Sequence, residues 1–175
     1  MGTTMTRRHH TTPVRHDRTR EYKGVRICTS CRAVYYRKAW HHDSQEFRRL
    51  RMREGQHVEH VLCAACKMIR THRYQGKVTI ENVPTHFAAE LVNLVLSYAK
   101  RARKYNPEHR LIEVHKDDHA LVLTTTEDQL AVALAKKVRD VFKRVQLNIH
   151  YANGLYGSTS VWVRFLEGEM PPRFA

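Results

Sequence analysis

The sequence predicts an α+β fold in two parts, and two observations carry this prediction. All four cysteines of the 175-residue chain fall into two C-x-x-C pairs, both within residues 22–76. From residue 77 onward, the apolar residues follow the two-residue period of strands and the 3.6-residue period of helices in turn. We therefore expect a four-cysteine zinc ribbon over residues 22–76 and a ferredoxin-like sandwich over residues 77–166.

The cysteine pairs are the most specific signal in the sequence. Cys28 and Cys31 form the first pair and Cys63 and Cys66 the second, with 31 residues between the pairs. Four thiolates suit one structural zinc ion, because zinc prefers a closed tetrahedral shell of soft donors. We expect each pair to form a tight turn that directs two sulfurs at the same centre.

Other uses of these cysteines stay open. Two disulfides would need an oxidising compartment, and the N-terminal residues lack the apolar run of a secretory signal. A redox-active C-x-x-C usually occurs singly, near a βαβ unit. His57 or His60 could replace or supplement a cysteine, although four sulfurs already complete the shell. Arg32 and Lys67 stand where such turns often have glycine.

Net charge indicates the class of partner. The chain has 31 Lys and Arg against 17 Asp and Glu, a net charge of +14. Residues 1–76 hold 17 basic and 6 acidic residues, or +11, whereas residues 77–175 carry only +3. A polyphosphate partner fits this charge, because each neutralised phosphate releases counterions. We expect RNA contacts from Arg7, Arg8, Arg15, Arg18, Arg20, Lys23, Arg26, Arg32, Arg37, Lys38, Arg48, Arg49, Arg51, Arg53, Lys67 and Arg70.

The N-terminal part has little material for a core. Residues 1–21 are almost without bulky apolar side chains, which predicts a disordered basic arm that orders on a partner or remains a solvated tail. A short helix is expected between Ser44, as N-cap, and Gly55, with Phe47 and Leu50 facing inward and arginines outward. We expect metal binding to contribute to the folding of this part.

The C-terminal part alternates strand and helix patterns in the order β-α-β-β-α-β, with one further strand. This order predicts an antiparallel sheet with both helices on one side, followed by a tail at residues 167–175. The second helix should begin at a capping box formed by Thr126 and Gln129. On the open face of the sheet, Trp162 is the one aromatic residue expected to resemble the base-stacking residues of RNA-binding modules.

Sequence motifs for catalysis are missing. There is no Gly-rich phosphate loop, no H-E-x-x-H motif, and no cysteine left as a nucleophile once zinc is bound. We therefore expect no catalytic residues and no small-molecule substrate. No segment approaches the length and apolarity of a membrane span, so no membrane partner is expected.

The cysteine pairs, the Tyr74-Gln75-Gly76-Lys77-Val78 junction and the α+β segment after it resemble the NMD-type (nonsense-mediated-decay-like) zinc-ribbon proteins of prokaryotes. These are shorter relatives of the adaptor that escorts the large ribosomal subunit out of the eukaryotic nucleus. Over roughly residues 22–166, the resemblance implies a cytoplasmic protein that docks on ribosomal RNA and binds zinc through its four cysteines. The adaptor has further cysteine pairs and domains that this chain lacks, so nuclear export is not implied.

The leading hypothesis is a non-catalytic, zinc-binding factor that binds rRNA on the ribosome and acts in assembly, quality control or stress (hibernation). Three rivals stay open: a zinc-dependent DNA-binding regulator, an enzyme acting on RNA with zinc as a scaffold, and a thiol-based redox sensor. The ribosomal subunit involved and the oligomeric state are not fixed by the sequence.

Overall fold

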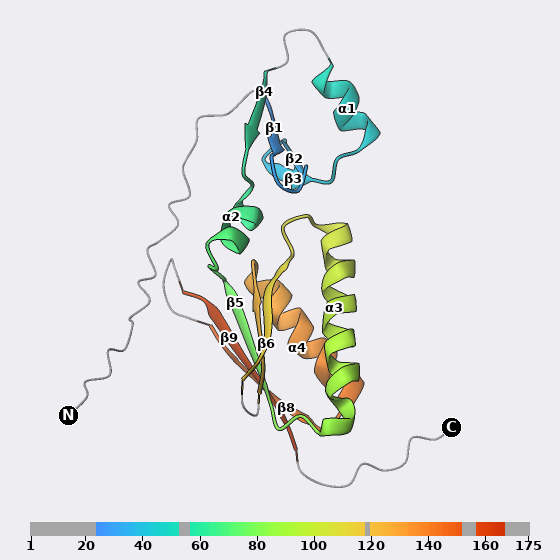
Figure 1. Cartoon of the computed structure of the whole chain (residues 1–175), viewed down its shortest axis with the longest axis vertical. Coiled ribbons are helices and arrows are strands. Elements are labelled where there is room, and N and C mark those ends of the chain that lie inside the picture. Colours follow the sequence, from blue (N-terminus) through green and yellow to red (C-terminus); the bar gives the residue numbers. More distant parts are fainter. Residues whose placement is uncertain (1–23, 53–56, 118–119, 152–156, 167–175) are drawn as a thin grey trace, which may run out of the picture.

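The computed structural model describes residues 24–52, 57–117, 120–151 and 157–166. Within these ranges the fold is mixed α+β, with two mixed sheets and four α-helices. The two sheets lie in separate parts of the molecule, stacked along its long axis in Figure 1. The predicted arm at residues 1–21 and the tail at residues 167–175 lie outside the described residues.

The N-terminal sheet has four short strands in the order β3-β2-β1-β4. β1 and β2 pair antiparallel around the first cysteine pair, β2 pairs antiparallel with β3, and β1 pairs parallel with β4. Its core is small: buried Val25, Ile27 and Val34 pack with a few half-buried neighbours. The strands are β1 (Val25–Cys28), β2 (Val34–Tyr36), β3 (Ala39–His41) and β4 (Val58–Val61).

Helix α1 (Gln45–Arg51) follows this sheet's last hairpin. The Phe47 amide donates to Ser44 Oγ over 3.4 Å, which confirms Ser44 as the N-cap. The Phe47 ring meets Tyr36 edge-on at a centroid distance of 5.8 Å and so packs against the sheet. The predicted terminator Gly55 lies outside the described residues, and α1 has already ended before it.

The C-terminal sheet has five strands in the order β6-β7-β5-β9-β8. The predicted β-α-β-β-α-β order with one further strand is confirmed. These strands are β5 (Gly76–Glu81), β6 (Leu111–Asp117), β7 (Ala120–Thr125), β8 (Val145–His150) and β9 (Thr159–Phe165).

The prediction of an antiparallel sheet is wrong at one pair of strands. β9 is inserted between β5 and β8, and it runs parallel to β5. Burial agrees with this order: the inward residues of β9 (Thr159, Val161, Val163 and Phe165) are all buried, whereas no residue of β8 after Val145 is buried. β9, which is covered along its whole inward face, takes the inner position, and β8 forms the edge.

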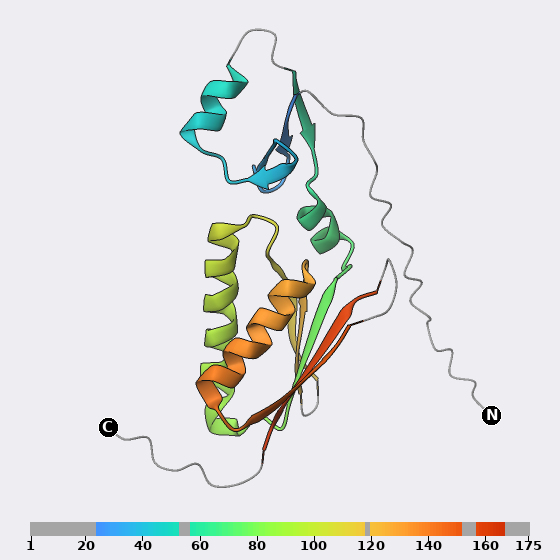
Figure 2. The ribbon, with the colours of Figure 1, turned by 180° about the vertical axis from the view of Figure 1, so that it is seen from behind.

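Two helices cover one face of this sheet, as predicted (Figures 1 and 2). A 3₁₀ turn, η1 (Thr85–Phe87), leads into α3 (Ala88–Tyr105), and α4 (Asp128–Phe142) packs on β5, β7, β8 and β9. Their inward residues join those of the strands in one buried cluster, which includes three interlocked phenylalanine rings. No helix in the described ranges is long and apolar enough to cross a membrane.

The predicted capping box at the start of α4 does not form. Glu127 is the N-cap, and its side chain makes no capping hydrogen bond. The Thr126 hydroxyl instead accepts a hydrogen bond from the Arg110 amide over 2.9 Å and donates to the Glu108 carbonyl over 2.5 Å. Thr126 therefore fastens the loop between α3 and β6, which is a tertiary role that local sequence does not reveal.

Glu127 gives the folded chain a pH dependence. Burial raises its pKa to about 7, helped by the carboxylates of Glu108 and Asp128. The folded state thus keeps a proton that the unfolded chain releases near its ordinary value of 4.5, so stability falls as pH rises from about 4.5 to 7. We expect Glu127→Gln to raise the unfolding free energy by about 1 kcal/mol at pH 8, and to change it little at pH 4.

Urea unfolding at the two pH values measures this difference. Asp140→Asn, an exposed change on the same helix, is the control and should keep the wild-type pH profile. An equal effect of Glu127→Gln at both pH values would contradict the assignment.

Candidate metal centre

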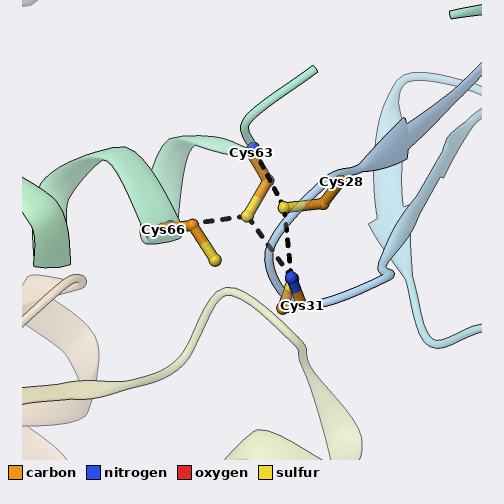
Figure 3. A group of neighbouring side chains, drawn as sticks. All are labelled: Cys28, Cys31, Cys63 and Cys66. Carbon is orange, nitrogen blue, oxygen red and sulfur yellow. Dashed lines mark hydrogen bonds between the residues drawn. The ribbon is translucent and has the colours of Figure 1, made fainter. Parts of the chain in front are cut away.

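The four cysteines converge at one point between the two parts of the molecule. Cys28 ends β1 and Cys31 follows in the turn, while Cys63 and Cys66 come from the start of α2 (Ala64–Arg70). Figure 3 shows the four side chains turned toward a common centre. Their sulfurs all lie within 4.8 Å of one another, and Cys28, Cys63 and Cys66 are buried.

The sulfur spacing separates a metal site from a disulfide. The Sγ atoms of Cys31 and Cys63 are 3.7 Å apart, and all four cysteines are free. A disulfide would bring two sulfurs to about 2.05 Å. Four sulfurs bound at about 2.3 Å around one tetrahedral ion lie about 3.8 Å apart. The cluster is therefore compatible with a single metal ion.

The first pair is held by a tight turn. The Cys28 amide donates to the Ala33 carbonyl over 2.8 Å, and the Cys31 amide approaches Cys28 Sγ at 3.5 Å. Arg32 has a φ of 65°, the left-handed conformation that usually selects glycine. The chain therefore makes the left-handed turn expected directly after Cys31. Because Arg32 has a Cβ, this conformation costs about 1 kcal/mol.

The second pair differs from the prediction of a second tight turn. Cys63 is the N-cap of α2, with its Sγ accepting from the Cys66 amide over 3.4 Å, and Cys66 lies in the first helical turn. Lys67 is therefore helical, so its position has no need of glycine. A helix directs the side chains of residues three apart to the same face, which brings both sulfurs to one centre.

The pKa of the Cys28 thiol shifts in the opposite direction from those of Cys63 and Cys66. Burial alone would raise the pKa of Cys28, but the amides of Cys31, Cys63 and Ser30 point at its sulfur and lower the pKa to about 6. Burial raises the pKa of Cys63 and of Cys66. Without a metal ion, the Cys28 thiol thus ionises more readily than the thiols of Cys63 and Cys66. A bound cation would displace the remaining protons.

Arg110, which precedes β6 in the C-terminal part, reaches into the cluster, and sequence analysis did not single it out. One terminal nitrogen, Nη1, lies 3.4 Å from Cys66 Sγ, and Nε donates to the Pro107 carbonyl over 2.7 Å. Burial alone would lower its pKa, but the sulfurs of Cys31, Cys66 and Cys63 outweigh this and raise it. No sequence signal marked Arg110, because its proximity depends on how the two parts dock.

No histidine that the structure describes joins the cysteine cluster. Among the described residues, the four cysteines form the only group of side chains that could hold a metal ion. His57 and His60 are exposed beside and on β4. His41 bonds the Tyr36 carbonyl over 3.1 Å and His42 bonds the Arg103 carbonyl over 2.6 Å. The structure thus gives no role at the centre to any of these four histidines, including His57 and His60, which the sequence offered as ligands.

The predicted RNA contacts fall into three groups. Those at residues 7–23 and Arg53 lie outside the described residues. Two with largely covered side chains are held in ion pairs: Arg26 with Glu59 at 2.8 Å, and Arg51 with Asp43 at 3.2 Å; the exposed Arg48 also pairs with Asp43, at 3.5 Å. Arg51 therefore does not fan outward as expected. The remaining predicted contacts are exposed: Arg32, Arg37, Lys38, Arg48, Arg49, Lys67 and Arg70.

Comparisons with known proteins add no further constraint. The chain matches no protein-family model, no curated protein and no solved structure.

Proposed function

We propose that this chain is a zinc-binding, non-catalytic protein that binds ribosomal RNA and acts on the ribosome. The observation that carries the proposal is the position of the four-thiol cluster within the part of the chain that holds most of the positive charge. Zinc fits because all four donors are sulfur. In this proposal, a four-cysteine ribbon folds around the ion and presents its basic side chains to RNA phosphates.

Exposed cations on the N-terminal part could reach a phosphate backbone. Arg37 and Lys38 form the tip of the β2–β3 turn, and Arg48 and Arg49 lie on α1. Arg48 is within 3.5 Å of Asp43, yet 65% of its side chain is exposed. Arginine suits this role, because its planar fork can bind two phosphate oxygens at once.

The C-terminal end of α3 extends the same surface. The hydrogen bond from His42 to the Arg103 carbonyl brings this end beside β3, which agrees with Figures 1 and 2. Tyr105, at the last position of α3, is 90% exposed and available to stack on an unpaired base. The exposed basic residues of this helix end are Lys100, Arg101, Arg103 and Lys104. They also complement the helix dipole.

Backbone strain supports a functional role for the β2–β3 turn. Arg37 and Lys38 both have positive φ, 49° and 66°. Two-residue hairpin turns with positive φ at both positions strongly prefer Asn-Gly. We expect the double change Arg37→Asn/Lys38→Gly to raise the unfolding free energy by about 1 kcal/mol. It should also weaken RNA binding about tenfold, because up to two phosphate contacts are lost.

Thermal unfolding and salt-dependent binding to rRNA fragments test this pair of opposite effects. The slope of log affinity against log salt should fall by about 1–2. Lys136→Ala/Arg139→Ala removes the same charge from α4 and should leave the slope nearer to that of the wild type. A more stable variant with unchanged RNA affinity would remove the turn from the interface.

The resemblance to NMD-type proteins supports the choice of rRNA and a cytoplasmic location. A role in assembly, quality control or stress (hibernation) is consistent with a basic protein that lacks a recognisable catalytic motif. We therefore propose that its partner is the ribosome itself.

Sucrose-gradient sedimentation of lysates at low and moderate salt tests the proposal. We expect the protein to migrate with ribosomal subunits or monosomes and to be released by high salt. Absence from every ribosomal fraction would contradict ribosome binding. Equal affinity for random duplex DNA and rRNA fragments would favour the DNA-binding alternative, and turnover of labelled RNA would favour the enzymatic one.

A further inference from the structure

We propose that Arg110 completes the metal centre from the C-terminal part of the chain: its buried guanidinium neutralises the metal–thiolate cluster and couples metal binding to the docking of the two parts. The inference rests on the proposed metal site and concerns a residue outside the four ligands.

Burial sets Arg110 apart from the other basic residues. Among the described residues, it is the only charged side chain that is buried, with 8% exposed. The ion pairs found among those residues do not include it. A buried cation is costly unless hydrogen bonds or opposite charge compensate it. The Glu108 carboxylate lies close enough to interact with Arg110, and the other opposite charge within its reach is that of the cysteines, one of which its guanidinium contacts.

The cluster supplies that charge when a metal ion is bound. Four thiolates around a divalent cation carry a net charge of −2 in a largely buried site. Nη1 of Arg110 already points at Cys66 Sγ over 3.4 Å. A cationic donor beside a metal-bound sulfur stabilises the thiolate form and reduces its reactivity, as groups around metal ligands commonly do.

The guanidinium is held in place by the C-terminal part alone. Its Nε donates to the Pro107 carbonyl, and its amide donates to Thr126 Oγ1 over 2.9 Å. The Thr126 amide returns a bond to the Arg110 carbonyl over 3.0 Å. These bonds fix the direction of the side chain without help from the cysteines, so the donor is preorganised for the metal centre.

The contact also joins the two parts of the molecule. Two further side-chain contacts between described residues of the two parts, His42 to Arg103 and His72 to Glu113 at 2.5 Å, are exposed. Water competes with exposed contacts, whereas it has little access to the Arg110–Cys66 contact. Metal binding that charges the cluster should therefore tighten docking, and docking should by linkage raise metal affinity.

Zinc affinity of the full-length chain, measured by competition with a chromophoric chelator, tests the inference. Arg110→Met removes the charge and the donors but keeps the apolar stem, and we expect it to weaken zinc binding about 10- to 100-fold. Arg110→Lys keeps the positive charge but lacks the planar guanidinium, so we expect an intermediate loss of zinc affinity. Arg164→Met, which breaks an exposed pair with Glu81 on the sheet, is the control and should stay near the wild type.

Two readouts distinguish this role from a merely structural one. The sulfur-to-metal charge-transfer band of the cobalt-substituted centre should shift in Arg110→Met, because the hydrogen bond to sulfur is lost. Zinc should also leave the variant several-fold faster under a thiol-reactive disulfide reagent. If Arg110→Met does not fold, Arg110→Lys carries the same measurements. Wild-type affinity and spectrum in both variants would overturn this inference alone, whereas a wild-type chain that takes up neither zinc nor cobalt would overturn the metal site itself.

Discussion

Replacing Cys63 by serine is expected to remove the metal and unfold the N-terminal part, while the C-terminal part stays folded. Serine is a good N-cap, so the start of α2 is preserved and the change tests the ligand itself. Structural zinc sites bind with about 10–16 kcal/mol, so one of four donors contributes roughly 3–4 kcal/mol. Affinity should fall by about two to three orders of magnitude.

Hydrogen exchange followed by mass spectrometry resolves the two parts. Amides of β1 to β4 and of α2 should lose protection in Cys63→Ser, because their own cores contain few buried side chains. Amides of the C-terminal sheet, which has a core of its own, should keep theirs. Thr29→Ser, an exposed change in the first cysteine turn, is the matched control. Retained protection in Cys63→Ser would show that the fold does not depend on the metal.

The second large effect is expected at Gly76, where β5 begins. A Cβ at this position would lie 2.5 Å from Ala131 Cβ and 2.5 Å from Thr125 Oγ1. Ala131 Cβ cannot move without shifting the backbone of α4, and rotating Thr125 Oγ1 away would break its hydrogen bonds to the Gly76 and Glu127 carbonyls. We expect Gly76→Ala to destabilise the C-terminal part by about 3 kcal/mol. Its melting temperature should fall by roughly 10–20 °C.

A double-mutant cycle tests whether the clash with Ala131 causes this destabilisation. Ala131→Gly removes one of the two clashing atoms but costs about 1 kcal/mol as a glycine within a helix. The double variant should be less destabilised than the sum of the single variants by about 1 kcal/mol or more. Gly157→Ala, at an exposed position, is the control. Additive effects of the two changes would mean that the contact with Ala131 is not the reason.

Local patterns were enough to predict most elements of the fold. The helical stripe of α3 and the alternation along β8 and β9 follow from side-chain direction alone, because each repeat places apolar residues on one face. The cysteine spacing predicted the four-sulfur cluster, because four soft donors in two C-x-x-C pairs have few other uses in one chain.

Features set by tertiary contacts could not be predicted in this way. The sequence does not show that β9 enters the sheet between β5 and β8, since both strands have the same alternation and differ only in how completely they are covered. The sequence predicts that Thr126 caps a helix, yet its hydroxyl forms hydrogen bonds with the backbone of Glu108 and Arg110 in the loop before β6. Arg110 is 44 residues from Cys66, and only the docking of the two parts brings them together.

The central claim is that four thiolates bind one zinc ion, and that this ion folds the basic N-terminal part that binds RNA. Elemental analysis of the freshly purified chain, before and after chelation, tests it most directly when RNA affinity is measured on the same samples. We predict one zinc per chain, lost on chelation together with hydrogen-exchange protection of β1 to β4 and with RNA affinity. A chain that contains no zinc, or that keeps its fold and RNA affinity after zinc is removed, would contradict the account.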